Sequence, residues 1–214
     1  MSNILQTQKI NKSYVSSVET LTVFRDLDFN LEKGKSLFLF GPSGCGKSTF
    51  LNMITGLDEP DSGKVLINNK NLNISNSSNF LKSDIGIIFQ DHYLLNELNI
   101  KDNLMIKSEK EEQLDFLLNF LDIKDIKLKF PYQISNGQKQ RVCVARSLMN
   151  KPQLIIADEP TSYLDKANSD KVIDLLVNYT KQFNTSLVVS SHDISYKNLF
   201  DFSYTIKDKK LIKC

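Results

Sequence analysis

A nine-residue loop, GPSGCGKST at positions 41–49, limits the possible folds of this chain more than any other stretch. It satisfies every position of the pattern G-x-x-x-x-G-K-[ST], which holds nucleotide phosphates between a strand and a helix. The apolar run at residues 36–40 has strand character, and residues 50–54 continue like a helix. The sequence therefore predicts an ATP site built on a strand, a glycine loop and a helix.

The residue types in this loop suit a phosphate group. Glycine lets the backbone close around phosphate oxygens, and the start of the helix adds its positive end. Lys47 is suited to neutralising the terminal phosphate, and the Ser48 hydroxyl to ligating Mg²⁺. A glycine-rich turn without a ligand is the alternative. The predicted nucleotide-binding residues of the loop are Gly41, Pro42, Ser43, Gly44, Cys45, Gly46, Lys47, Ser48 and Thr49.

Length and composition narrow the class of protein. With 214 residues and 41% hydrophobic content, the chain can bury a sizeable core as one domain, alone or with a smaller lobe. Its 27 basic and 25 acidic residues leave a formal net charge of +2, which gives no electrostatic reason to expect nucleic acid as a partner. No apolar run approaches the roughly 18 residues of a membrane span, and nothing resembles a signal peptide. Work at a membrane would therefore require partner subunits.

The cysteines favour a reducing, cytosolic compartment. Cys45, Cys143 and Cys214 are an odd number without C-x-x-C spacing. They predict neither a disulfide framework nor a zinc site.

Two alternating stretches precede the loop. Residues 4–14 and 18–31 mix short apolar and polar segments, which predicts antiparallel strands. Tyr14 lies where its ring could reach a bound adenine by stacking. A tyrosine buried in the core is the alternative.

The stretch after the loop helix returns to strand character. Residues 64–67 predict a strand, and the asparagine-rich residues 68–78 an exposed connection. Residues 85–89 predict a buried strand that ends at Gln90, a position suited to a ligand crevice. Structural capping is the alternative role for Gln90.

The pattern changes to helical spacing over residues 91–149. One apolar stripe is formed by Leu114, Leu117, Leu118 and Leu121, and core packing is its simplest explanation. A second helix is predicted to start at residues 135–138, where exposed backbone amides offer another anion site. We expect a small helical unit inserted between strands.

Paired carboxylates follow the apolar run at residues 154–157. Such a run is typical of a buried parallel strand, whose C-terminal end faces the nucleotide in an open α/β sheet. Asp158 is then placed to ligate Mg²⁺, and Glu159 to polarise the water that attacks the γ-phosphate. A simple helix-capping pair is the alternative.

The last third of the chain continues the alternation of helix and strand. Residues 166–183 predict a helix whose core face carries Leu175, Leu176, Tyr179 and Phe183. Residues 187–189 predict a buried strand, and His192 follows its end as Gln90 and Asp158 follow theirs. A lone histidine is usually structural, but this shared position favours a nucleotide contact. Residues 202–206 and 210–212 suggest a closing hairpin.

Taken in order, these motifs resemble those of the nucleotide-binding subunits of ATP-binding cassette (ABC) transporters, along essentially the whole chain. The matching segments are the Walker A loop GPSGCGKST, the glutamine-loop residue Gln90, the signature ISNGQ at 134–138, the Walker B segment LIIADE, the D-loop SYLD at 162–165 and the switch histidine His192. The resemblance implies a P-loop NTPase core with a mostly parallel sheet flanked by helices, an N-terminal antiparallel β subdomain and an inserted helical subdomain. Residues 1–90 and 151–214 would form the core, and residues 91–150 the insertion, within a single domain.

The resemblance also implies a head-to-tail homodimer with two ATP molecules at its interface. Each ATP would be held by the Walker A loop of one subunit and the signature of the other. The implied catalytic residues are Glu159 as general base, His192 as γ-phosphate contact and Gln90 as sensor of the metal and the attacking water. The implied Mg²⁺ ligands are Ser48, Gln90 and Asp158, and the further nucleotide or interface residues are Tyr14, Ser135, Gly137, Gln138 and Asp165.

Within the family, the tracts VETLTVFRDLD and QDHYLLNELNIKDNL resemble the subgroup of lipoprotein-release, macrolide-export and cell-division ATPases, the lipoprotein-release member most. This implies integral-membrane permease partners, with the ATPase in the cytoplasm, peripheral to the inner face of the membrane. Two alternatives are an ATPase of the cell-division type that regulates wall hydrolases without transport, and a soluble ATPase of iron–sulfur assembly.

Two positions depart from the family's pattern. Asn136 stands where the signature LSGGQ has glycine, and Tyr163 where the D-loop usually has a small or amide residue. Asparagine tolerates left-handed backbone better than other non-glycine residues, so we expect a working site. Tyr163 adds bulk beside the expected dimer seam and makes interface geometry harder to predict.

Overall fold

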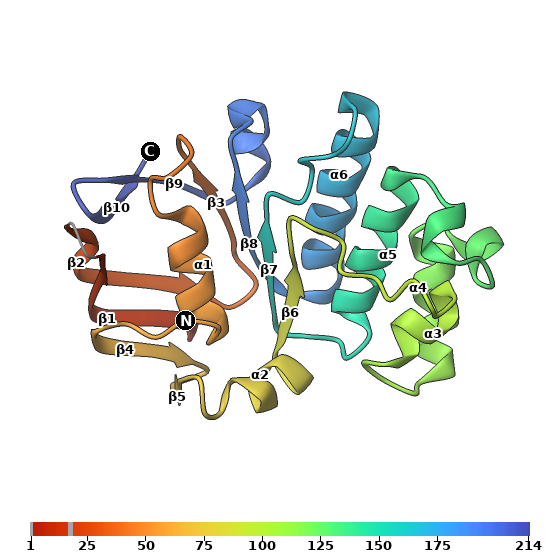
Figure 1. Ribbon diagram of the computed structural model, residues 1–214, viewed down its shortest axis with the longest axis horizontal. Coiled ribbons are helices and arrows are strands. Elements are labelled where there is room, and N and C mark those ends of the chain that lie inside the picture. Colours follow the sequence, from red (N-terminus) through yellow and green to blue (C-terminus); the bar gives the residue numbers. More distant parts are fainter. Residues whose placement is uncertain (1, 17–18) are drawn as a thin grey trace.

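Figure 1 shows an α/β molecule with three parts along its longest axis. The computed structural model describes residues 2–16 and 19–214. An antiparallel sheet lies at one end, a mainly parallel sheet in the middle and a group of helices at the other end. The predicted fold class is confirmed.

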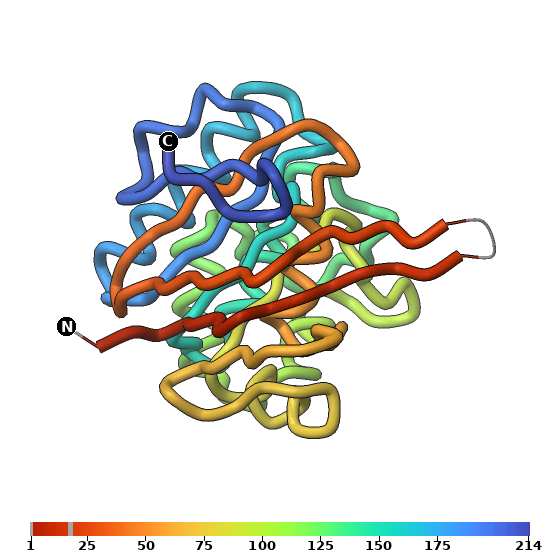
Figure 2. The backbone as a smooth tube through the Cα atoms, turned by 90° about the vertical axis from the view of Figure 1, so that its left-hand side faces the viewer, coloured from red at the N-terminus to blue at the C-terminus, as the bar shows by residue number. Residues whose placement is uncertain are grey.

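The antiparallel sheet pairs the first two strands of the chain with two later ones, in the order β2-β1-β4-β5. Figure 2 shows β1 and β2 running side by side across one face of the molecule. The bounds are β1 (Asn3–Val15), β2 (Thr20–Glu32), β4 (Ser62–Ile67) and β5 (Lys70–Leu72). Both predicted N-terminal strands are therefore present, although the predicted start of the second, Val18, lies outside the described residues.

The central sheet has the order β10-β9-β3-β8-β7-β6, in which neighbours from β9 to β6 are parallel and β10 closes the edge as an antiparallel hairpin. The bounds are β3 (Ser36–Phe40), β6 (Ile85–Ile88), β7 (Leu154–Asp158), β8 (Ser186–Ser191), β9 (Phe202–Lys207) and β10 (Lys210–Lys213). The innermost strands are buried on both faces, as their unbroken apolar runs predict. Because these strands are parallel, the segments that follow β3, β6, β7 and β8 meet at one edge.

Helices cover this sheet and extend beyond it. α1 packs against β7, α5 against β6 and α6 against β8, while α3 and α4 pack on α5. The bounds are α1 (Lys47–Thr55), α2 (Ser77–Ser83), α3 (Ile100–Met105), α4 (Glu111–Phe120), α5 (Asn136–Leu148) and α6 (Lys166–Phe183), with short 3₁₀ turns η1 (Lys124–Ile126), η2 (Pro131–Gln133) and η3 (Ile194–Leu199).

The predicted leucine stripe of α4 forms part of the core. Leu114, Leu117 and Leu118 are fully buried, and Leu121 is 1% exposed. Each such side chain contributes about 1.5–3 kcal/mol of transfer free energy, so burial of the stripe is a large contribution to the packing of α4. The core-packing interpretation is confirmed.

Two predictions about local structure were wrong in part. On α6, Leu176 and Tyr179 are buried as predicted and Leu175 packs partly buried against the core, whereas Phe183 is 42% exposed at the end of the helix. The stretch 68–78 is not a plain connection, because it contains β5 and the start of α2. Its asparagines bridge the turn between these elements, as when the Asn76 side chain donates to the carbonyl oxygen of Asn71.

Candidate functional site

The phosphate-binding loop joins β3 to α1, and its last glycine begins the helix. Gly46 has a φ of 110°, and a Cβ at this position would lie 2.7 Å from Cγ1 of Val23. A side chain would therefore be both strained and in collision. No side chain caps α1, which leaves the first amide groups of the helix available to an anion.

Lys47 is buried and folded back on the loop. Its ammonium group donates hydrogen bonds to the carbonyl oxygens of Gly41, at 2.8 Å, and Pro42, at 3.3 Å. It also lies 3.7 Å from Oε1 of Glu159. A phosphate would compete for this ammonium with a stronger, charge-assisted hydrogen bond.

Glu159 follows β7 directly and lies between two basic side chains. Its Oε2 is 2.9 Å from Nδ1 of His192 and accepts a second hydrogen bond from the His192 backbone N–H at 3.3 Å. Its other oxygen faces Lys47. The His192 side chain is 70% exposed, so it is not a structural histidine of the core.

Ser190 in β8 is a site residue that the sequence reasoning missed. Its hydroxyl donates to Oδ1 of Asp158 at 2.6 Å and accepts from the backbone N–H of Glu159 at 3.0 Å. Ser190 is fully buried and lies opposite Asp158 in the register of β7 and β8. The available signal was a hydroxyl at the end of an apolar run, beside a strand that ends in carboxylates. The pair Asp158–Glu159 is thus anchored to the neighbouring strand, and helix capping does not explain it.

Tyr14 extends from β1 toward the loop and is 42% exposed, which excludes the buried-core alternative. Its hydroxyl donates to Oδ2 of Asp58 at 2.9 Å, with the Thr49 hydroxyl 3.4 Å away. Burial alone would raise the pKa of Asp58, but hydrogen bonds from Lys12 and Tyr14 outweigh it and hold the pKa below its usual value. Tyr14 is therefore fixed at its tip while its ring remains accessible.

A hollow of about 520 Å³ lies at the edge where the parallel strands end. Most of the predicted site residues line it: Tyr14, Ser43, Gly44, Gly46, Lys47, Ser48, Thr49, Gln90, Glu159 and His192. The remaining lining residues are Leu21 and Val23 of β2, with Ser162 and Tyr163 beside Glu159. Residues from six separate segments thus converge on one cleft. Of the remaining loop residues, Gly41 and Pro42 form its back by accepting from Lys47, and Cys45 is partly exposed.

The signature residues do not line this hollow. Ser135 and Gln138 form a closed capping box at the start of α5, in which the Ser135 hydroxyl accepts from the Gln138 N–H and Gln138 Oε1 accepts from the Ser135 N–H. A Cβ on Gly137 would lie 3.0 Å from Oδ1 of Asn168, so the signature packs on the first turn of α6. Asp165 caps that helix by accepting from the Asn168 N–H at 2.9 Å.

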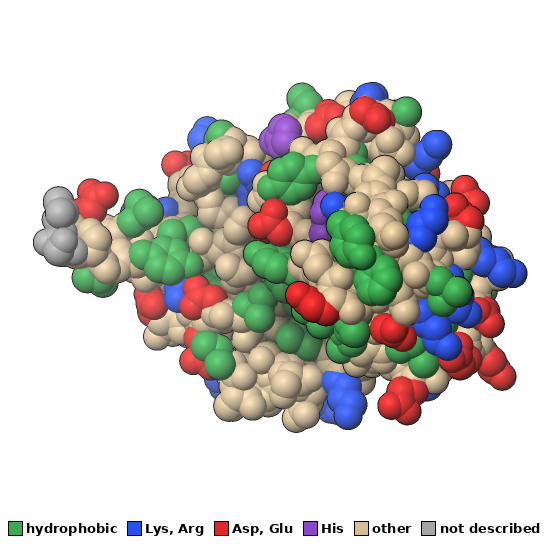
Figure 3. Space-filling model, turned by 45° about the vertical axis from the view of Figure 1, so that its right-hand side comes forward, with side chains coloured by type: hydrophobic (Ala, Val, Ile, Leu, Met, Phe, Trp, Pro, Cys, Tyr) green, Lys and Arg blue, Asp and Glu red, His purple; other side chains and the backbone are tan. Residues whose placement is uncertain are grey.

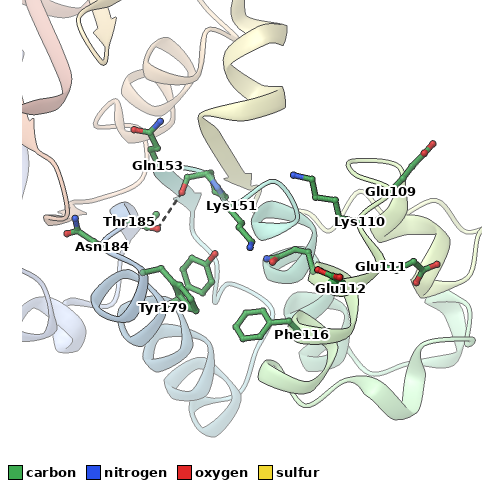
Figure 4. A pocket seen from close by; sticks show the side chains of 13 residues that line it. Glu109, Lys110, Glu111, Glu112, Phe116, Lys151, Gln153, Tyr179, Asn184 and Thr185 are labelled. Carbon is green, nitrogen blue, oxygen red and sulfur yellow. Dashed lines mark hydrogen bonds between the residues drawn. The ribbon is translucent and has the colours of Figure 1, made fainter.

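A larger hollow of about 790 Å³ lies between α4 and the end of α6, where β7 and β8 begin. Figure 4 shows Phe116 and Tyr179 on its walls, with Lys151 and Glu112 nearby. It contains none of the residues predicted for nucleotide chemistry. The volume of a hollow therefore does not identify the functional site, whereas the convergence of the strand ends does.

Figure 3 shows hydrophobic side chains over the middle of one face, with acidic and basic side chains interspersed on its right-hand side. Within residues 2–16 and 19–214, no helix is both long and apolar enough to cross a membrane.

Comparison with known proteins agrees with this geometry. The family model described as ABC transporter matches residues 24–162. The lipoprotein-releasing system ATP-binding protein LolD of Treponema denticola is 37% identical, with 95% of each chain covered. The LolD protein of Colwellia psychrerythraea is 39% identical over 94% of this chain and 82% of its own. The ABC transporter ATP-binding protein YxdL of Bacillus subtilis is 35% identical over 90% of this chain and 79% of its own.

Solved structures of ATP-binding cassettes also resemble this chain. A dimeric ATP-binding cassette, MJ0796, in a post-hydrolysis state with ADP and Pi superposes with a TM-score of 0.87 at 29% identity, covering 97% of this chain and 96% of that one. The cbiO1 protein of Clostridium perfringens, part of an ABC transporter complex, has a TM-score of 0.86 at 26% identity, covering 99% of this chain and 88% of its own. The chain therefore belongs to the ABC transporter family, as an ATP-binding and ATP-hydrolysing subunit.

Proposed function

We propose that this chain hydrolyses ATP at the hollow lined by Lys47, Glu159 and His192, and that it thereby drives membrane-embedded permease subunits in lipoprotein release. The contact of Glu159 with Lys47 on one side and His192 on the other is the observation that carries the proposed chemistry. The names of the LolD relatives, which are 34–39% identical, support the assignment of the pathway. The chain would lie in the cytoplasm, attached to the inner face of the membrane through those partners.

In the proposed mechanism, Lys47 leaves the carbonyl oxygens of Gly41 and Pro42 and binds the terminal phosphate. Release of Lys47 frees one oxygen of Glu159, which can then accept a proton from the attacking water. His192 holds the other oxygen and contacts the γ-phosphate. The ring of Tyr14 stacks on the adenine.

The residues proposed to hold Mg²⁺ fit the ion. Ser48, Gln90 and Asp158 offer a hydroxyl, an amide and a carboxylate oxygen, the hard donors that Mg²⁺ prefers. Ser48 and Gln90 line the same hollow, and Ser190 orients the Asp158 carboxylate at 2.6 Å. A bound Mg²⁺ would neutralise charge on the β- and γ-phosphates.

The second half of each site is proposed to come from another copy of the chain. Ser135, Gly137 and Gln138 lie outside the hollow of their own chain, and MJ0796 was solved as a dimer. We infer a head-to-tail homodimer in which these residues meet the γ-phosphate in trans and Asp165 links across the interface. Residues 91–150 would then act as an inserted helical unit on a core of residues 1–90 and 151–214.

Replacing the proposed base tests the catalytic assignment. Glu159→Gln keeps the shape of the side chain but removes its ability to take a proton, so turnover should fall by roughly 100- to 10,000-fold with ATP binding retained. Phosphate release and the binding of a fluorescent ATP analogue measure the two quantities. Glu112→Gln, an exposed change on α4, is the matched control. Unchanged hydrolysis in Glu159→Gln would remove the residue from this role.

Co-purification of the chain from its own cells tests the pathway. A membrane partner with a large lipoprotein-handling periplasmic domain is expected. A four-span partner that recruits wall hydrolases would instead support regulation without transport. A wholly soluble complex would support iron–sulfur assembly.

A further inference from the structure

Tyr163 connects two segments of the site that are distant in sequence. It lies in the loop between β7 and α6, with 52% of its surface exposed. Its hydroxyl donates a hydrogen bond to Oδ1 of Asp91 at 3.1 Å. Asp91 directly follows Gln90, so the loop after Walker B is joined to the glutamine loop within one chain. This bond also raises the pKa of Tyr163, and the hydroxyl stays protonated at neutral pH.

The loop that carries Tyr163 is itself joined to Glu159. The hydroxyl of Ser162 donates to the carbonyl oxygen of Glu159 at 3.0 Å, and the Ser162 N–H donates to the same oxygen at 3.1 Å. The contacts therefore run without a break from Glu159 through Ser162 and Tyr163 to Asp91.

The position of Gln90 depends on the contacts of the residues that follow it in the chain. Its side chain makes no hydrogen bond with the residues that the structure describes, although it lines the hollow. Downstream, Arg146 of α5 donates to the carbonyl oxygens of His92 at 2.8 Å and Tyr93 at 2.6 Å. Tyr163 holds the segment on the side of the nucleotide, and Arg146 holds it on the side of the helical group.

We propose that Tyr163 is a positioning residue for Gln90, which it holds at a fixed distance from Glu159 through its hydrogen bond to Asp91. This inference rests on the proposed hydrolysis of ATP in this hollow. The Tyr163 hydroxyl bonds to Asp91 and makes no hydrogen bond to Glu159 within the described residues. Its loss should therefore lower kcat, since Gln90 is misplaced in the reacting complex, and leave the affinity for ATP unchanged.

A double-mutant cycle on the full-length chain tests the proposal. Tyr163→Phe and Asp91→Ala each remove the hydrogen bond, so each should lower kcat by about two- to tenfold, the usual worth of one such bond. The double variant should lose no more than either single variant, because both changes break the same contact. Asp91→Asn keeps an oxygen acceptor and should retain most of the activity. The dissociation constant of N-methylanthraniloyl-ATP should stay within about twofold throughout.

Tyr93→Phe is the matched control, because Tyr93 lies in the same segment and its hydroxyl makes no hydrogen bond with the described residues. It should hydrolyse ATP as the unmodified chain does. Full kcat in Tyr163→Phe, additive losses in the double variant, or an equal loss in Asp91→Asn and Asp91→Ala would each overturn the inference. An unmodified chain that fails to hydrolyse ATP would instead refute the proposed function. Should Tyr163→Phe fail to fold, the comparison of Asp91→Ala with Asp91→Asn still shows whether the hydrogen-bond acceptor at position 91 is needed for kcat.

Discussion

The helices α1 and α5 both begin with a glycine-containing motif, yet their first turns are in opposite states. α1 starts at Gly46 without a side-chain cap, so its amide groups are free. α5 starts at Ser135 inside a closed capping box with Gln138. The free amide groups at the start of α1 can bind an anion, whereas the capping box at the start of α5 already supplies hydrogen-bond partners from the same chain.

This difference shows which half of the site is complete in the single chain. The loop before α1 needs only a phosphate, because the Lys47 ammonium group already lies against the loop backbone. The start of α5 must open its box, or donate from the Ser135 hydroxyl, before it can meet a phosphate of another copy. We therefore expect changes at α1 to affect ATP binding, and changes at α5 to affect the later steps.

The largest expected effect is a difference in thiol reactivity between Cys45, in the loop before α1, and Cys143, in α5. Burial raises the pKa of Cys143 in α5 from its ordinary value near 9 to about 11. At pH 8 both values lie above the pH, and each unit lowers the thiolate fraction tenfold, so Cys143 should react about 100-fold more slowly than an ordinary thiol. Cys45 in the loop is partly exposed, and iodoacetamide should label it before Cys143. Peptide mass spectrometry measures both rates.

ATP should protect Cys45 from this labelling and leave Cys143 unaffected. The alkylated loop should no longer bind ATP, because the Cys45 sulfur lies against Gly41 and an added group there would displace the loop backbone. A chain that is alkylated at Cys45 and still binds ATP would contradict the assignment. Cys214 is exposed and serves as the internal reference.

A side chain at the start of α1 should weaken ATP binding. In Gly46→Ala the new Cβ meets Val23 at 2.7 Å on a backbone with φ near 110°, and the loop must move to relieve a strain of about 1–3 kcal/mol. ATP affinity should fall roughly ten- to hundredfold, as titration calorimetry would measure. Gly63→Ala is the matched control, since its φ is 93° and its Cβ would lie 2.5 Å from the carbonyl oxygen of Gln8, away from the site. Equal losses of affinity in both variants would show general destabilisation.

Loss of the cap at α5 should have the smallest effect. Ser135→Ala removes the hydroxyl that accepts from the Gln138 N–H and should lower the free energy of unfolding by about 0.5–1 kcal/mol. ATP binding to the single chain should persist, and ATP-driven dimerisation should weaken. Urea unfolding and light scattering with ATP measure these effects. Asn99→Ala removes a comparable cap from α3 and should lower stability without changing dimerisation. A drop in ATP affinity for Ser135→Ala would place the signature within the site of its own chain.

Local patterns in the sequence predicted much of this structure. The predicted helix at 166–183 coincides with α6, and the leucine stripe of α4 is buried as its spacing predicted. The strand ends that carry Gln90, Asp158 and His192 also follow from apolar runs. These features repeat with the period of a helix or a strand, and a single segment is enough to reveal them.

Contacts between distant segments could not be predicted in this way. Ser190 holds Asp158 only because β7 and β8 are neighbours in register, and Tyr163 reaches Asp91 across 72 positions of sequence. The error at Phe183 has the same origin, because a helical stripe does not reveal where the packing partner ends. Aromatic contacts with Phe116 and Tyr179 cover part of that ring while leaving it 42% exposed.

The sequence by itself determined the phosphate-binding loop, the order of the motifs and the parallel strands that lead to them, since each depends on residue types at short spacing. Only the tertiary structure decided that Lys47 lies near Glu159, that Ser190 orients Asp158, and that Tyr163 joins the loop after Glu159 to the segment after Gln90. The physical reason is that such contacts depend on distances between strand ends. Those distances are set by the order and register of the sheet as a whole.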